Sequence, residues 1–272
     1  TEWIADRPAI DPATDAGIVC RPESTCFQLY TSGTTGRPKG VELMHSNLLA
    51  VMEAGARAWS IDADSVSLVA MPLFHIAGGG WAVAGLCHGA ENVLLRDLDP
   101  DELLRLVERH RVINALFVPA VLQILGRHPR IREVDLGSFR SIVYGASPIS
   151  EDVLVRAMEV FGCGFVQVYG LTETTGAITN LAYEDHDPGG PRGHLLRSAG
   201  RPWSDVQIRI VDAETLEDLP EGEVGEVVVT SLDPHHPLLR FALGDLSGVL
   251  AGPRPCGRTN MRIKGWMGRA DQ

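Results

Sequence analysis

Short β-rich runs alternate with helical patterns along much of this sequence, and this alternation limits the folds that the chain can adopt. The strand patterns lie at 25–31, 66–71, 92–95, 113–118, 139–144 and 164–169. The helical patterns lie near 45–58, 80–88, 100–110, 119–127 and 150–161. Alternation of this kind is typical of βαβ units, so we expect an α/β fold with a doubly wound, mostly parallel sheet. Such sheets bind ligands in the loops at the carboxyl ends of their strands.

The pattern changes near residue 185, which suggests a second region. A polar passage rich in glycine and proline, EDHDPGGPRG at 184–193, precedes runs of period two at 206–211 and 225–230. Period-two runs without long helical patterns predict a smaller β-rich subdomain, antiparallel or barrel-like. We therefore expect an α/β core over 1–187 and a β-rich subdomain over 188–272.

The charge balance excludes several classes of partner. The chain carries 24 Lys and Arg against 35 Asp and Glu, a formal net charge of −11. This charge repels nucleic acids and anionic membrane surfaces, so we expect neither as a partner. A small anionic ligand remains compatible with it, because backbone N–H groups can form a local binding site.

Cysteine usage and hydropathy bear on the compartment. The five cysteines are scattered and form no CxxC pair, and no basic-then-apolar leader is visible, so we expect reduced thiols and a cytoplasmic protein. The stretch 65–90 contains no charged residue, but Pro72 and the glycines at 78–80 interrupt it. We therefore expect no transmembrane segment.

The segment YTSGTTGRPKG at 30–40 carries the strongest indication of chemistry. Its glycines allow backbone N–H groups to converge on an anion, its hydroxyls add donors, and Lys39 adds a mobile positive charge. The common NTPase loop requires four residues between its glycines and a Ser or Thr after its lysine, and this segment has neither. The segment predicts a phosphate-binding loop of another type; a flexible, solvated loop is the alternative.

Three later segments complete a resemblance. They are MPLFHIAG at 71–78, YGASPIS at 144–150 and QVYGLTETTG at 167–176. Together with the first loop they resemble, in order, the adenylate-forming (AMP-binding) superfamily, which contains acyl-CoA synthetases, aryl-CoA ligases and peptide-synthetase adenylation domains. The pattern is most similar to that of fatty acyl-CoA synthetases. It covers about 24–180, and it implies that the chain is a fragment of a larger N-terminal domain.

The resemblance implies a set of ATP-binding residues. From the first loop these are Thr31, Ser32, Gly33, Thr34, Thr35, Gly36 and Lys39; from the later segments they are Gly145, Ala146, Ser147, Gln167, Tyr169, Gly170 and Thr172. Among them it gives Lys39 and Thr172 catalytic roles at the phosphates.

Glu173 is the candidate magnesium ligand. It follows the predicted strand 164–169, so it lies at a carboxyl end that faces the same crevice as the first loop. A carboxylate there suits Mg²⁺, which prefers one or two protein oxygens together with phosphate oxygens. The resemblance assigns Mg²⁺ to Glu173; a solvated loop glutamate is the alternative.

His75 and the small residues after it permit two interpretations. In its apolar run His75 is either a hydrogen-bonded core histidine or, as the resemblance implies, a catalytic-site residue that positions substrate between the ATP and acyl sites. Ala77, Gly78 and Gly79 carry no bulk, so they either leave room for an acyl group or allow close helix packing.

The end of the chain departs from the fatty-acyl pattern. HHPLLRFALGD at 235–245 has Leu243 where a Thr is typical, and GDLSGVL followed by CGRTNMRIKGWMGRAD resembles phenylacetate-CoA ligases. The resemblance implies that Asp245 holds the ribose hydroxyls and Arg269 a ribose or phosphate group, with Arg258 as a competing choice. It places an interdomain hinge at Asp271. A zinc site from His235, His236 and Cys256 lacks any ligand spacing, so we expect solvated histidines and a free thiol there.

These expectations together predict an acid–thiol ligase. The expected reaction is ATP- and Mg²⁺-dependent activation of an apolar carboxylic acid, foremost a fatty acid, to an acyl-adenylate, followed by transfer to coenzyme A in the full-length enzyme. An aryl-CoA ligase and a non-catalytic nucleotide-binding fragment are the alternatives. An amino-acid adenylation domain ranks last, because the run 65–90 offers no carboxylate for an amino group.

Overall fold

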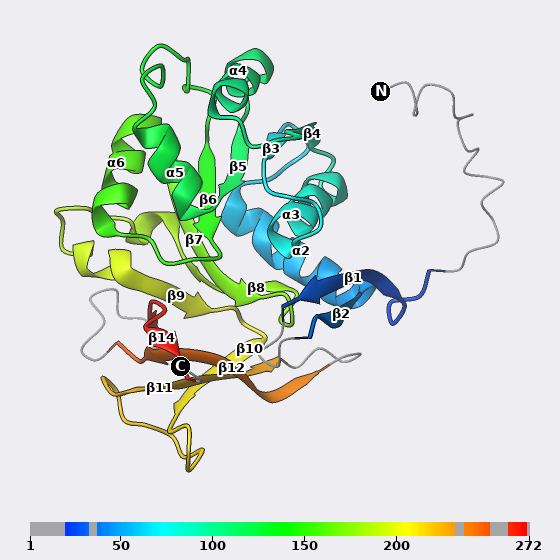
Figure 1. The fold of residues 1–272 in the computed structure, drawn as a ribbon, viewed down its shortest axis with the longest axis vertical. Helices are drawn as coiled ribbons and strands as arrows, with labels where there is room; N and C mark the ends of the chain where they lie inside the picture. Colours follow the sequence, from blue (N-terminus) through cyan, green and yellow to red (C-terminus); the bar gives the residue numbers. More distant parts are fainter. Residues whose placement is uncertain (1–19, 33–36, 232–236, 251–260, 271–272) are drawn as a thin grey trace.

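The computed structural model describes residues 20–32, 37–231, 237–250 and 261–270. An eight-stranded sheet in the order β13-β9-β8-β7-β6-β5-β3-β4 forms its centre (Figure 1). The strands are β3 (Val66–Val69), β4 (Glu91–Leu94), β5 (Asn114–Phe117), β6 (Ser141–Gly145), β7 (Gly164–Leu171), β8 (Gly176–Leu181), β9 (Ser198–Pro202) and β13 (Ile263–Lys264). Strands β4, β3, β5, β6 and β7 run parallel, and β8, β9 and β13 continue the sheet antiparallel.

Five helices pack around the parallel strands. They are α2 (His45–Trp59), α3 (Ile76–Cys87), α4 (Pro100–His110), α5 (Pro119–Gly126) and α6 (Glu151–Phe161). Helices α5 and α6 lie on one side of the sheet and α2 and α3 on the other (Figure 1). Every residue of β5 and β6 is therefore buried, as a parallel strand covered on both faces requires.

Local sequence signals explain where α4 and α6 begin and end. The Asp99 carboxylate accepts a hydrogen bond of 2.9 Å from the Glu102 N–H, and Pro100 occupies the first turn of α4. Helix α6 has Glu151 and Asp152 in its first turn, where the helix dipole favours negative charge, and it ends at Gly162 with a φ of 60°.

A separate four-stranded antiparallel sheet follows, in the order β10-β11-β12-β14. Its strands are β10 (Val206–Val211), β11 (Val224–Ser231), β12 (Leu238–Gly248) and β14 (Gly268–Arg269). It has its own buried core, which includes Ile208, Val227, Val229 and Leu243. The predicted fold class, α/β with a mostly parallel sheet and a smaller β-rich part, is confirmed. The division at residue 187 stays a prediction; β9 and β13, which follow it, pair within the large sheet.

The first predicted strand is present but lies outside the large sheet. Strand β1 (Thr25–Thr31) pairs antiparallel with β2 (Lys39–Met44), with Thr31 opposite Lys39. The described ends of the predicted phosphate-binding loop therefore lie side by side on an antiparallel pair of strands. Within the described part of the chain, no helix has both the length and the apolar character that a bilayer crossing requires.

Candidate functional site

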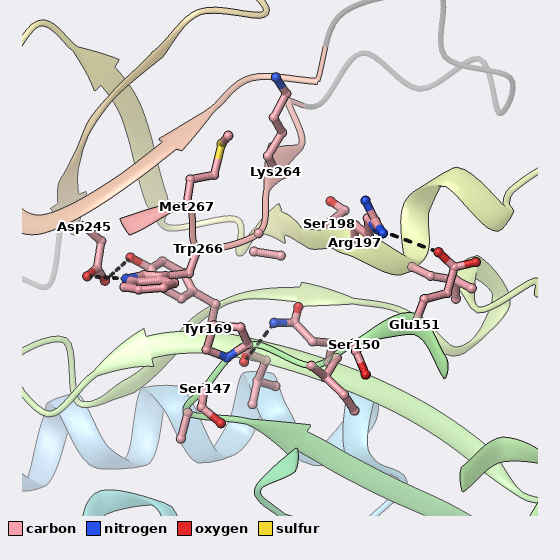
Figure 2. Close-up of a pocket in the computed structure, with 18 of the residues that line it drawn as sticks. Ser147, Ser150, Glu151, Tyr169, Arg197, Ser198, Asp245, Lys264, Trp266 and Met267 are labelled. Carbon is pink, nitrogen blue, oxygen red and sulfur yellow. Dashed lines mark hydrogen bonds and ion pairs between the residues drawn. The ribbon is translucent and has the colours of Figure 1, made fainter. Parts of the chain in front are cut away.

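A cleft of about 1110 Å³ opens where the carboxyl ends of β6 and β7 face the segment 264–267 and Asp245 of β12 (Figure 2). Of the predicted nucleotide-binding residues, six line this cleft: Ala146, Ser147, Gln167, Tyr169, Gly170 and Asp245. They come from β6, β7 and β12, so the fold assembles them from positions far apart in the sequence. A large cleft at the carboxyl ends of parallel strands is where an α/β sheet binds ligands.

The loop after β6 reaches the cleft because its backbone is unusually compact. A Cβ on Gly145 would lie 2.2 Å from the carbonyl oxygen of Val168, so only glycine fits there. Ala146, the next residue, has a φ of 64°, in the left-handed region that non-glycine residues rarely adopt. Strain of this kind is concentrated at binding sites, and here it directs the loop toward the cleft.

A buried hydrogen bond holds the start of this loop. The Tyr144 hydroxyl lies 2.9 Å from His186 Nε2, and His186 Nδ1 lies 2.9 Å from the Ala182 carbonyl oxygen. A carbonyl can only accept, so Nδ1 carries the proton and the tyrosine hydroxyl donates to Nε2. Burial lowers the pKa of His186, which keeps the imidazole neutral as this arrangement requires.

Asp245 is the most heavily hydrogen-bonded group of the cleft. Its side chain is almost fully buried, and it accepts from the Tyr169 hydroxyl at 2.8 Å, from Trp266 Nε1 at 3.1 Å and from Arg269 Nη1 at 3.1 Å (Figure 2). Burial, followed by the charge of Asp245, raises the pKa of Tyr169, so its phenol remains a donor. Arg269, which we expected to contact the nucleotide, is thus tied to the carboxylate that we expected to hold the ribose.

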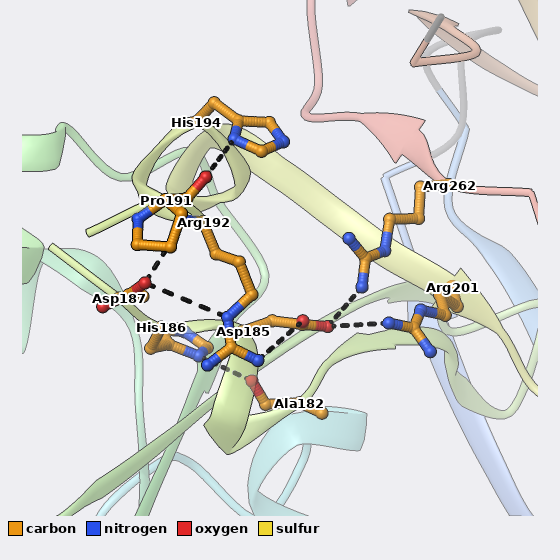
Figure 3. A network of polar contacts seen from close by, with 9 residues as sticks. All are labelled: Ala182, Asp185, His186, Asp187, Pro191, Arg192, His194, Arg201 and Arg262. Carbon is orange, nitrogen blue, oxygen red and sulfur yellow. Dashed lines mark hydrogen bonds and ion pairs between the residues drawn. The ribbon is translucent and has the colours of Figure 1, made fainter. Parts of the chain in front are cut away.

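A second buried carboxylate positions the wall of the cleft. Asp185, which is 2% exposed, lies 2.7 Å from Nη2 of Arg262 and 3.2 Å from Nη2 of Arg201, with Arg192 further out at 4.0 Å (Figure 3). Arg262 directly precedes β13, which leads into 264–267. A buried charge is stable only when it is paired, so these ion pairs fix β13 against the large sheet. No local pattern predicts this network, because its members are far apart along the chain.

The predicted magnesium ligand lies against the first loop. Glu173 is the second residue after β7, and its Oε1 accepts a hydrogen bond of 3.2 Å from the Thr31 hydroxyl, 142 residues away. Glu173 also lines a neighbouring cavity of about 530 Å³ together with Lys39. The structure thus brings Thr31, Lys39 and Glu173 to one place. Ser32 is exposed next to them, and Thr172 is half-buried after β7. The candidates Gly33, Thr34, Thr35 and Gly36 lie outside the described residues.

The oxygen ligands at this place suit Mg²⁺. A carboxylate with an adjacent hydroxyl supplies the hard oxygen donors that the ion prefers. Within the described ranges there is no group of three or more His, Cys, Asp or Glu that could hold a metal ion alone. A magnesium ion at Glu173 would therefore need phosphate oxygens and water as its other ligands. The alternative zinc residues His235, His236 and Cys256, with Arg258 and Asp271, lie outside the described residues.

His75 is not a core histidine. It precedes α3 in an extended conformation, its side chain is exposed, and its ring centroid lies 4.6 Å from that of Phe74. Its carbonyl oxygen accepts from the N–H groups of Gly78 and Gly79 at the start of the helix. His75 lines none of the three cavities named in this section, so its positioning role stays a prediction.

A small apolar cavity of about 80 Å³ adjoins the cleft. Helix α3 contributes Ala77 and Gly80 to its lining, and the cleft residues Ala146, Tyr169 and Gly170 separate the two spaces. Among the described residues that line it, none is charged. The rings of Trp59 and Trp81 also line it, with centroids 5.6 Å apart. Neither tryptophan could be identified from the sequence as a cavity residue, because an aromatic residue in an apolar helix is usually only part of the core.

Gly78 and Gly79 are not among the residues that line this cavity, so their role in substrate binding stays a prediction. A Cβ on Gly78 would lie 2.2 Å from the Pro72 carbonyl oxygen, and one on Gly79 would lie 2.7 Å from that of Leu73. Both glycines are buried against the loop that precedes α3. They allow close helix packing, whereas Ala77 keeps its predicted place beside an apolar cavity.

Comparison with known proteins agrees with this arrangement. Residues 4–232 match the family described as "AMP-binding enzyme". A fatty acid–[acyl-carrier-protein] ligase of Streptomyces coeruleorubidus is 37% identical over 235 residues, which are 84% of this chain and 44% of that protein. A medium/long-chain fatty-acid–CoA ligase of Mycobacterium tuberculosis is 34% identical over 209 residues, 77% of this chain and 35% of its own length. The chain thus spans less than half the length of these curated relatives.

One solved structure of the same fold contains the two ligands that the sequence predicts for this chain. The O-succinylbenzoate coenzyme A synthetase of Bacillus subtilis, in complex with ATP and magnesium ion, superposes with a TM-score of 0.75 at 25% sequence identity. The match covers 93% of this chain and 51% of that one. A fold of this kind with this cleft defines an adenylate-forming domain. The chain belongs to the AMP-binding family of adenylate-forming enzymes, as its motifs predicted.

Proposed function

We propose that this protein activates an apolar carboxylic acid with ATP and transfers the resulting acyl group to a thiol. The observation that carries the proposal is the meeting of Thr31 and Glu173 beside a cleft that contains Asp245. Candidate residues for phosphate, metal and ribose recognition thus come from three sheets and lie near the carboxyl end of β7. The acid would occupy the apolar cavity next to that cleft.

The chemistry requires that two anions react. A carboxylate oxygen attacks the α-phosphorus of ATP, a new O–P bond forms, and the bond to the β-phosphate oxygen breaks to release pyrophosphate. Lys39 and the hydroxyls of Thr31 and Thr172 would offset the charge that develops on the phosphates. A magnesium ion bound at Glu173 would neutralise part of the same charge.

The described cavity supports an uncharged acyl group. A second carboxylate, or an ammonium group, on the acyl part of the acid would be buried in the cavity without a partner, because no charged residue is found among those described around it. Burial of an unpaired charge is costly. A fatty acid is favoured, since the two relatives described above are named for fatty acids. An aromatic acid is the second candidate, because Trp59 and Trp81 line the cavity and could pack edge-to-face against a ring.

The acceptor is proposed as coenzyme A. The name of one relative specifies coenzyme A and that of the other an acyl carrier protein, and both acceptors end in a thiol. In the second step the thiol sulfur attacks the acyl carbon, and AMP leaves with the electrons of the broken C–O bond. A nucleotide-binding protein without turnover is the alternative, and it predicts no acid-dependent reaction at all.

Acid-dependent exchange of pyrophosphate into ATP tests the proposal, using the protein in its natural length. We expect exchange with fatty or aromatic acids, and a loss of about 10²–10³-fold in Glu173→Gln, because one positioned charge is removed from the reacting phosphates. Glu53→Gln is the matched control, because Glu53 is an exposed residue of α2 that lines none of the three cavities. ATP binding without exchange for any acid would favour the non-catalytic alternative.

A further inference from the structure

Trp266 lines the cleft and lies against Asp245, the carboxylate that we expect to hold the ribose. Its indole Nε1 donates to Asp245 Oδ1, which also accepts from Arg269 Nη1, while Oδ2 accepts from the Tyr169 hydroxyl. Three donors therefore already surround one carboxylate. Figure 2 shows the indole of Trp266 lying between Asp245 and the open part of the cleft.

The Asp245 carboxylate has too few acceptor positions to bind a ribose diol in addition to its three present donors. A carboxylate offers about four lone-pair positions, and three are in use here. The two hydroxyls of a ribose diol would add two donors, one at each oxygen, and the total of about five exceeds the capacity. One of the present donors must leave when the diol binds.

Trp266 is the donor that can leave at least cost. The Tyr169 hydroxyl is well buried, and Arg269 is a charged partner whose hydrogen bond to a carboxylate is roughly twice as strong as a neutral one. Trp266 donates from a neutral N–H, and 44% of its surface is exposed.

The backbone around Trp266 is fixed, so only its side chain needs to move. The Gly265 N–H donates to the Arg197 carbonyl at 2.8 Å, and the Met267 N–H donates to the Leu246 carbonyl at 2.9 Å. The ion pairs of Arg262 with Asp185 hold the preceding residues in the same way. A rotation of the Trp266 side chain is therefore enough to release one acceptor position on Asp245 Oδ1.

We propose that Trp266 is a displaceable latch that competes with the 2′,3′-diol of a nucleotide for Asp245 and so lowers the affinity of the site for nucleotides that carry the diol. In the state described here the indole N–H satisfies Asp245, and a ribose diol replaces it. A nucleotide that lacks the diol gains nothing from displacing the indole. The proposal rests on the proposed function, because it takes Asp245 as the ribose-binding group.

The test compares AMP with 2′,3′-dideoxyadenosine 5′-monophosphate, titrated by calorimetry against the natural-length protein and Trp266→Phe. Phenylalanine keeps an aromatic ring but has no N–H to displace. We expect Trp266→Phe to bind AMP about three- to tenfold more tightly, as the loss of one competing hydrogen bond implies, and the dideoxy nucleotide with unchanged affinity. Met267→Leu is the matched control for packing, since Met267 lines the same cleft without bonding to Asp245, and it should affect both nucleotides equally.

Fluorescence supplies a second readout. Trp59 and Trp81 are nearly fully buried and Trp203 packs against Trp59, whereas Trp266 is exposed to a quencher. AMP should change the collisional quenching of the parent protein by acrylamide, and this change should disappear in Trp266→Phe and Trp266→Leu. Weaker AMP binding by both variants, or equal effects on the two nucleotides, would overturn the latch while leaving the nucleotide site intact. No binding of AMP by the parent protein would overturn the proposed function, and the latch with it.

Discussion

The large cleft and the apolar cavity share Ala146, Tyr169 and Gly170, yet they are built in different ways. The cleft is formed by loops and strand ends, and buried carboxylates with their hydrogen bonds fix its shape. The cavity is formed where α2 and α3 pack against the strands of the large sheet, and glycines and tryptophans are among the residues that line it. The difference indicates that the nucleotide side of the proposed site selects its ligand through hydrogen bonds to polar groups. The acid side selects its ligand through the size of the acyl group that fits the cavity.

The residues between the cleft and the cavity, such as Gly170, should tolerate substitution less than any other part of the molecule. A Cβ on Gly170 would lie 1.8 Å from the Gly176 carbonyl oxygen, so Gly170→Ala must separate β7 from β8. We expect a loss of ~3 kcal/mol or more in the free energy of unfolding, measured by urea denaturation. Gly162→Ala is the matched control: Gly162 has a φ of 60° and open space around it, so alanine should cost only about 1 kcal/mol. Equal losses would show that the boundary is not tightly packed.

Removal of the cleft carboxylate should affect the nucleotide and not the acid. Asp245→Ala takes away the group that we expect to hold the ribose and leaves the Tyr169 hydroxyl without its acceptor. We expect AMP to bind about tenfold or more weakly, because hydrogen bonds to a charged group contribute ~1.5–3 kcal/mol. Calorimetric titration with AMP measures this, and an unchanged dissociation constant would remove Asp245 from the site.

A smaller volume of the apolar cavity should affect the acid and not the nucleotide. Ala77→Leu adds bulk to a space of about 80 Å³ and should disfavour the larger acids of a homologous series. We expect a fall of about tenfold in kcat/KM for them, since one to three methylene groups in an apolar pocket have effects of this size. Pyrophosphate release across a panel of acids measures it. If the acid profile did not change, Ala77 would not line the acyl site.

The smallest expected effect concerns pH. The pKa of His186 is lower in the folded protein than in the unfolded chain, so the unfolded chain binds more protons as the pH falls below about 6.5. The stability that this neutral imidazole contributes is therefore present above pH 6.5 and is lost as the pH falls. His186→Gln, which cannot titrate, should flatten the dependence of the melting temperature on pH between 7 and 5. An unchanged slope would assign that dependence to other groups.

Much of the α/β part could be predicted from the sequence, because its signals are local. Pro100 after Asp99 starts α4, and continuous apolar runs mark β5 and β6. Strand β12 was missed, because Arg240 and Gly244 have positive φ values and its register against β11 shifts, which breaks the period of two.

The parts of the site that depend on tertiary contacts could not be predicted in the same way. The motifs identified Glu173 and Asp245, but no local pattern relates Arg262 to Asp185 or Trp266 to Asp245. The sequence could not decide whether Gly78 and Gly79 line a pocket or allow close packing, because a glycine in a sequence indicates small size but not which atoms it faces. The carbonyl oxygens of Pro72 and Leu73 decide that question.

One ligand that spans both spaces tests the central claim, which is that the cleft and the cavity form a single site for an acyl-adenylate. An acyl-sulfamoyl adenosine, a stable analogue of that intermediate, is titrated against the natural-length protein, Asp245→Ala and Ala77→Leu, with AMP as the reference ligand. The account predicts that both variants weaken binding of the analogue, whereas only Asp245→Ala weakens binding of AMP. Unchanged affinity of Ala77→Leu for analogues of every acyl size would contradict it, because the acyl group would then lie outside the cavity.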